Sequence, residues 1–169
     1  MISEAEIRRI SAATRVDPMV VDLDYSLGWF LLGMRKTSTA LGGLLFKGGT
    51  CLRKCYFHDY RFSEDLDFTA TKYLSPADIE DWVKKSVDWV SNYDGPDFHV
   101  QPIHFEVVDD EYGNESYQAR IYYRGPLRWG GSPRTVKLDI TRAEVILLPV
   151  NEKQIIHSYS DQASFADIN

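Results

Sequence analysis

Residues 44–70, LLFKGGTCLRKCYFHDYRFSEDLDFTA, contain the sequence signals on which the predicted fold depends. They open with a short apolar run typical of a β-strand, continue through Gly48-Gly49-Thr50, and then show apolar residues at helical spacing. We predict a strand, a tight glycine turn and a helix start. Glycines let a ligand approach the backbone, and helix N-termini attract anions such as phosphate. Gly48, Gly49 and Thr50 would therefore bind the triphosphate of a nucleotide through backbone N–H groups and the Thr50 hydroxyl. The alternative is an ordinary turn with Thr50 as N-cap.

Two carboxylates follow in the same stretch, within Arg61-Phe62-Ser63-Glu64-Asp65-Leu66-Asp67. Asp65 and Asp67 are two residues apart, so on a strand they point the same way. Adjacent carboxylates repel each other and need a cation or full solvation. Magnesium, or manganese in its place, takes such oxygen ligands and bridges to substrate phosphates. Together with the glycine turn, the pair predicts nucleotidyl transfer from a nucleoside triphosphate (NTP).

The residues that flank this pair have two readings each. Arg61 and Ser63 are candidate nucleotide-binding residues, because a guanidinium there could bind a phosphate or orient Asp65. The alternative for Arg61 is a surface ion pair with Glu64. Lys47 and Lys54, near the glycine turn, are either phosphate contacts or surface charges.

A third candidate carboxylate lies in TVKLDIT, residues 135–141, where apolar and polar residues alternate as in a strand. Asp139 and Lys137 share its polar face. On a strand next to the Asp-x-Asp strand, Asp139 would complete a three-carboxylate metal site. Lys137 would balance the carboxylates or contact a phosphate, and a solvated lysine is the alternative.

The motifs KGGTCLRKCYF and RFSEDLDFT resemble the signature of the AbiEii/AbiGii nucleotidyltransferase toxins, within the DNA polymerase β-like superfamily. The resemblance implies Asp65, Asp67 and Asp139 as metal ligands and catalytic residues. It covers nearly all of this chain but only the first half of a typical member, whose helical second half is not in this sequence. Whether this is a fragment or a shortened homologue stays open.

The same resemblance implies a type IV toxin–antitoxin or abortive-infection system, with RNA, and tRNA in particular, as the acceptor. A cognate antitoxin is implied as a partner. Two other functions stay open: a non-catalytic nucleotide- or partner-binding module of the same fold, and nucleotidyl transfer to a protein hydroxyl.

Composition is consistent with one folded domain. The chain has 169 residues, of which 44% are hydrophobic, and no segment approaches the length of a membrane span, so we expect a cytoplasmic protein. We predict an α/β or α+β fold: a small mixed sheet flanked by helices, with residues 1–40 forming N-terminal helices packed on a nucleotidyltransferase core. Further strands are expected at 98–108, 117–124 and 154–159, and a helix after Ser75-Pro76.

The net charge of −6 argues against binding nucleic acid through overall attraction, so a contact with RNA needs a local patch. Between residues 118 and 142 the sequence has six basic residues and a single acid, Asp139. With aromatic residues interleaved, this strip could bind single-stranded RNA. Core aromatics alternating with solvated arginines are the alternative. Its members are Arg120, Arg124, Arg128, Arg134, Lys137 and Arg142, with Tyr122, Tyr123 and Trp129.

Overall fold

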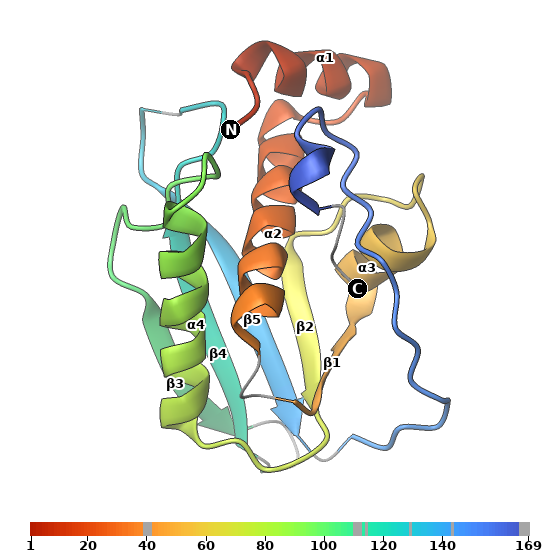
Figure 1. Cartoon of the computed structure of the whole chain (residues 1–169), viewed down its shortest axis with the longest axis vertical. Coiled ribbons are helices and arrows are strands. Elements are labelled where there is room, and N and C mark those ends of the chain that lie inside the picture. The colour runs from red at the N-terminus through yellow and green to blue at the C-terminus, as the bar shows by residue number, and fades with distance from the viewer. Residues whose placement is uncertain (39–41, 110–112, 114, 129, 143, 166–169) are drawn as a thin grey trace.

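The computed structural model describes residues 1–38, 42–109, 113, 115–128, 130–142 and 144–165. A five-stranded sheet in the order β1-β2-β5-β4-β3 forms its centre (Figure 1). The strands are β1 (Leu44–Lys47), β2 (Asp65–Ala70), β3 (His104–Asp109), β4 (Glu115–Tyr123) and β5 (Arg134–Arg142). The helices are α1 (Glu4–Thr14), α2 (Pro18–Thr37), the short α3 (Gly48–Cys51) and α4 (Pro76–Ser91). A π-helical turn (Leu52–Tyr56) continues α3, and a 3-10 turn (Gln162–Phe165) lies near the C-terminus.

The sheet is mixed, as the sequence predicts. β2 pairs with β5 in parallel, whereas the β1–β2, β4–β5 and β3–β4 pairs are antiparallel. The predicted hairpin between β3 and β4 is confirmed, although β3 begins at His104 rather than Phe98. The fold is therefore α+β, with one parallel pair inside a largely antiparallel sheet.

Helices α2 and α4 lie side by side over one face of the sheet (Figure 1). Their apolar residues and the even-numbered residues of β2 and β5, such as Leu66 and Leu138, form one core. Gly33 lets the two helices approach closely, since a Cβ there would lie 2.6 Å from the carbonyl oxygen of Ser86. Because side chains alternate along a strand, the odd-numbered residues of β2 and β5 point to the opposite face.

Helix starts follow the capping signals in the sequence. Ser3, the N-cap of α1, accepts a hydrogen bond from the Glu6 N–H. Asp17, the N-cap of α2, precedes Pro18 and accepts one from the Met19 N–H. The carboxylate of Glu6 does not complete a capping box; it accepts hydrogen bonds from Ser160 instead. α1 is thereby joined to the C-terminal segment. Within the described residues, no helix is long and apolar enough to cross a membrane.

A buried ion pair joins α2 to the helical turn that follows the glycines. Asp24 and Lys54 are each 2% exposed, and the Lys54 ammonium donates to an Asp24 carboxylate oxygen at 2.7 Å. Burial alone would raise the pKa of Asp24, but the Lys54 ammonium and the Arg53 guanidinium outweigh it and hold this pKa below its usual value. Lys54 is therefore neither a phosphate contact nor a surface charge, which corrects both sequence readings.

The C-terminal segment packs against this pair without forming a strand. The predicted strand at residues 154–159 is wrong: only one backbone hydrogen bond, from the Ile156 N–H to the Lys54 carbonyl, ties it to the turn. The Tyr159 hydroxyl donates to Asp24 at 2.7 Å. Asp161 accepts from the Tyr25 hydroxyl and the Trp29 indole. Side chains, rather than a strand ladder, hold this segment on α2.

We predict that Asp24→Asn destabilises the fold strongly. The amide keeps the shape of the carboxylate but leaves the Lys54 ammonium buried without an anion, so the free energy of unfolding should fall by about 3–5 kcal/mol. Urea denaturation measures this loss. Asp94→Asn, at an exposed aspartate, is the matched control and should change the free energy by less than about 0.5 kcal/mol.

A second variant tests the cause of that loss. Replacing both charges, in Asp24→Asn/Lys54→Met, removes the unpaired ammonium and should recover part of the stability. If the double variant is no more stable than Asp24→Asn alone, the buried charge is not the cause.

Candidate active site

The site forms where β2 and β5 run in parallel. Their register sets Asp67 directly opposite Asp139, and Asp65 directly opposite Lys137. All four side chains leave the sheet on the face away from α2 and α4. The sequence predicted the shared face of each strand; the structure adds that the two strands are neighbours in this register.

The carboxylates repel one another. Burial raises the pKa of Asp67, and the charges of Asp139 and Asp65 raise it further. Burial and the Asp65 charge likewise raise the pKa of Asp139, while Lys137 acts in the opposite sense. Each of these two groups thus holds a proton more readily than an ordinary aspartate and gains from a nearby cation.

Two lysines supply part of the positive charge. The Lys137 ammonium lies 3.6 Å from Asp65 Oδ1, and both side chains are about half exposed. Lys47, opposite Asp67 on β1, donates to Thr141 Oγ1 at 2.7 Å and forms an ion pair with Glu144. Lys47 is thus held beside the carboxylates by protein groups.

Glu144 is a site residue that sequence analysis missed. Burial alone would raise its pKa, but hydrogen bonds from Lys47 and Thr69 outweigh burial and hold it below its usual value. Glu144 follows β5 and belongs to no motif, so no sequence signal marked it.

The glycine turn touches the Asp67 carboxylate. Gly48 adopts a φ of 75°, the left-handed region that glycine favours, and a Cβ there would lie 2.2 Å from Asp67 Oδ2. A Cβ on Gly49 would lie 2.9 Å from Ser63 Oγ and 3.5 Å from Arg61 Nη2. The turn, the carboxylate and the two flanking polar residues therefore form one surface, as the sequence predicted.

Thr50 departs from both of its sequence readings. Its side chain is buried and its hydroxyl donates to the carbonyl oxygen of Asp65 at 2.5 Å. The helix begins at Gly48 with Lys47 as N-cap, so Thr50 is not the cap. Thr50 ties the turn to β2, and its hydroxyl is engaged with the backbone rather than free for a phosphate.

The structure also shows the surroundings of Arg61. Arg61 is exposed and, among the described residues, forms no ion pair with Glu64.

The basic strip between residues 118 and 142 does not form one patch. Arg134 donates to the Met19 carbonyl on the helix side, Arg142 pairs with Glu115, and Tyr123 is buried in the core. Trp129 lies outside the described residues.

The donor chemistry of the site suits a hard divalent cation. Asp65 Oδ1 is buried and, among the described residues, accepts no hydrogen bond. Burial in the first place, and the neighbouring carboxylates in the second, raise the pKa values of Asp67 and Asp139. Oxygen ligands of this kind are those that Mg²⁺ prefers. In the described part of the chain, however, no three acidic, histidine or cysteine side chains converge as a formed metal site. The carboxylate ligands are of the type that Mg²⁺ binds, but the side chains of Asp65, Asp67 and Asp139 do not converge on one point in this structure.

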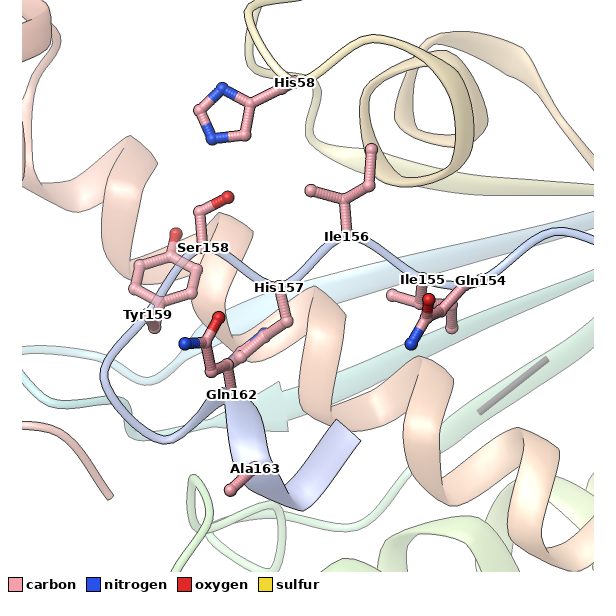
Figure 2. Close-up of a pocket in the computed structure, with 9 residues that line it drawn as sticks. All are labelled: His58, Gln154, Ile155, Ile156, His157, Ser158, Tyr159, Gln162 and Ala163. Atoms are coloured by element: carbon pink, nitrogen blue, oxygen red, sulfur yellow. The ribbon is translucent and has the colours of Figure 1, made fainter. Parts of the chain in front are cut away.

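A cavity of about 830 Å³ lies elsewhere, along the C-terminal segment (Figure 2). Residues 154–159 line it, with His58, Gln162 and Ala163. Figure 2 shows the His58 ring facing this segment across the opening. None of the predicted site residues lines the cavity. The Asp67 and Asp139 carboxylates lie instead on the open face of the sheet, away from α2 and α4.

Comparison with protein families assigns the chain. A family model described as "Nucleotidyl transferase AbiEii toxin, Type IV TA system" matches residues 29–169, most of the chain. The chain belongs to the AbiEii family. The AbiEii match includes the glycine turn and all three candidate carboxylates, and it confirms the family that the motifs indicate. A search of curated proteins found no match.

Two solved structures from Helicobacter pylori resemble this AbiEii chain. JHP933 is 24% identical with a TM-score of 0.47, over 67% of this chain and 41% of that one. A second protein, assigned as a nucleotidyltransferase, is 22% identical with a TM-score of 0.44, over 69% of this chain and 44% of that one. The chain thus matches less than half the length of either structure.

We predict that Gly48→Ala displaces the Asp67 carboxylate, because the new methyl group would occupy the position of Oδ2. The carboxylate should move away from Asp139, so the pKa of Asp67 should fall toward its ordinary value. A pH titration of the Asp67 carboxyl carbon by NMR measures the change.

Gly113→Ala is the matched control. Gly113 has nearly the same φ, 76°, but no described residue has an atom within 4 Å of a Cβ there. Both variants should lose about 1–2 kcal/mol of stability from the left-handed backbone, and only Gly48→Ala should change the pKa of Asp67. An unchanged pKa in Gly48→Ala would contradict the proposed contact.

Proposed function

We propose that this AbiEii chain transfers a nucleoside monophosphate from an NTP to a hydroxyl group of RNA. One observation carries the proposal: Asp67 lies opposite Asp139 on parallel strands, beside a glycine turn whose Gly48 contacts the Asp67 carboxylate. Membership of a nucleotidyltransferase family supports the reaction class. The open face of the sheet supports a macromolecular acceptor over a small one.

In the proposed reaction the acceptor oxygen attacks the α-phosphorus of the NTP. A new P–O bond forms, the bond from the α-phosphorus to the bridging oxygen breaks, and pyrophosphate leaves with the bonding electrons. Asp139 accepts the proton of the acceptor hydroxyl. Its raised pKa suits this role, because a general base works best when its pKa is closer to the operating pH.

Asp65, Asp67 and Asp139 would hold magnesium, or manganese in its place. When bound, the metal would lower the pKa of the acceptor hydroxyl and neutralise charge on the leaving pyrophosphate. Their oxygen donors suit this ion, and Asp65 Oδ1 accepts no hydrogen bond from the described residues. Lys137, which lies 3.6 Å from Asp65, adds positive charge and is close enough to exchange that contact for a phosphate oxygen.

The triphosphate would lie on the glycine turn. The backbone N–H groups at Gly48 and Gly49 would donate to its oxygens, and Arg61 and Ser63, which lie beside Gly49, would add side-chain donors. Thr50 supports this turn through its hydrogen bond to Asp65 rather than through phosphate contact.

Membership of a family described as a type IV TA toxin supports an antitoxin as partner. We propose tRNA as the leading RNA acceptor, a cognate antitoxin as the partner, and the cytoplasm, where NTP and tRNA are present, as the location. Because the chain spans 41% of JHP933, these are proposals for the whole protein.

The direct test is transfer of each α-labelled NTP, with magnesium, to total RNA and to soluble protein. We expect label in RNA, and a loss of at least about 100-fold in Asp67→Asn. Glu64→Gln, at an exposed carboxylate just before β2, is the matched control and should retain transfer. Equal labelling by wild type and Asp67→Asn would contradict the assignment of Asp67, and label in protein alone would identify a protein hydroxyl as the acceptor.

A further inference from the structure

Three side chains of β4 lie next to the carboxylates on the same open face. Gln118 is opposite Asp139, and Arg120 is opposite Lys137. Tyr122 follows two residues further along the strand. Because alternate residues of a strand share a face about 7 Å apart, an amide, a guanidinium and a phenol ring extend in line from the catalytic pair.

Arg120 is available for a ligand. It is exposed, and among the described residues it makes no hydrogen bond or ion pair. It acts electrostatically on Asp139, and its other neighbour across the sheet is His104, which lies 3.6 Å from Glu106. Glu106 is the acid that flanks this row, opposite Gln118. Next to the carboxylates, this face therefore carries two positive side chains, Arg120 on β4 and Lys137 on β5. Glu106 on β3 is the acid at its outer edge.

Two other arginines of the basic strip, Arg134 and Arg142, lie on the opposite face of the sheet. Both are even-numbered, like the core residues of β5. Arg134 donates a hydrogen bond to the Met19 carbonyl, and Arg142 forms an ion pair with Glu115. Strand alternation thus leaves Arg120, and not Arg134 or Arg142, on the face that carries the carboxylates. Among the described residues, the Arg120 side chain forms no ion pair, whereas Lys137 on the same face pairs with Asp65.

We propose that Gln118, Arg120 and Tyr122 bind the acceptor as a single-stranded RNA segment whose terminal hydroxyl reaches Asp139. Arg120 binds a backbone phosphate, the Tyr122 ring stacks on a base, and the Gln118 amide hydrogen-bonds the nucleotide beside the carboxylates. A sheet face that combines aromatic and cationic side chains is a common platform for single-stranded RNA. This inference rests on the proposed function, since it names the surface that holds the acceptor of that reaction.

The test measures binding rather than transfer. A fluorescein-labelled single-stranded RNA is titrated with the full chain, and anisotropy is followed at several salt concentrations. Arg120→Ala should weaken binding about tenfold. It should also reduce the slope of log K against log salt by about 0.7, the value for one phosphate contact on a single strand.

Tyr122→Leu separates stacking from charge. It should weaken binding about tenfold without a change in the salt slope. Arg9→Ala, which removes an exposed arginine on α1, is the matched control and should alter neither quantity. Thermal unfolding of each variant checks that it is folded.

Three results would overturn the proposal. One is wild-type RNA affinity in both Arg120→Ala and Tyr122→Leu, and another is no RNA binding by the wild-type chain. The third is a rise in the KM for NTP in Arg120→Ala with unchanged RNA affinity, which would assign Arg120 to the triphosphate. Labelling of RNA by wild-type protein alongside any of these would leave the proposed function standing and reject only this surface.

Discussion

The parallel pairing of β2 with β5 is the constraint on which the rest of the site depends. It sets Asp67 opposite Asp139, so two carboxylates on different strands share one small area of the open face. A shift of one residue in this register would move one of them to the core side of the sheet. The apolar residues between them, Leu66 and Leu138, are buried and hold the register.

Two neighbouring carboxylates destabilise a fold unless something compensates their charge. In this chain the compensation is partial. Lys137 lies near Asp65, and Lys47 is shared with Glu144. Burial and the neighbouring carboxylates still raise the pKa values of Asp67 and Asp139. Retained repulsion of this kind is expected where a cation or a proton takes part in function rather than in folding.

The glycine turn depends on contacts far from it in sequence. Lys54, in the turn that continues α3, is held by Asp24 of α2, and Tyr159 of the C-terminal segment binds the same carboxylate. These contacts fix the helical turn behind Gly48 and Gly49. The position of the turn against Asp67 is therefore set by α2 and the C-terminal segment together.

Short-range patterns predicted the parts of this arrangement that depend on local geometry. The i, i+2 spacing of Asp65 and Asp67, the glycine turn and the alternation around Asp139 all correspond to observed elements. The same alternation, once strand partners are known, divides the basic strip and leaves Arg120 on the open face.

Contacts between distant segments could not be predicted in the same way. Nothing local marks Lys54 as buried, because its partner Asp24 lies thirty residues earlier in the chain. The sequence predicts a strand at residues 154–159, yet no edge of the sheet pairs with them in the described structure, and side chains such as Tyr159 hold them on α2. Thr50 could not be distinguished from an N-cap until Asp65 was placed beside it.

The most direct test of the site is divalent metal binding, measured by the loss of the electron paramagnetic resonance signal of free Mn²⁺. We expect the wild-type chain to bind Mn²⁺ and Mg²⁺ to compete for the same site. Asp67→Asn/Asp139→Asn should abolish this binding, and Glu64→Gln should retain it. Equal Mn²⁺ binding by the wild type and the double variant would contradict a metal site at the β2–β5 pair.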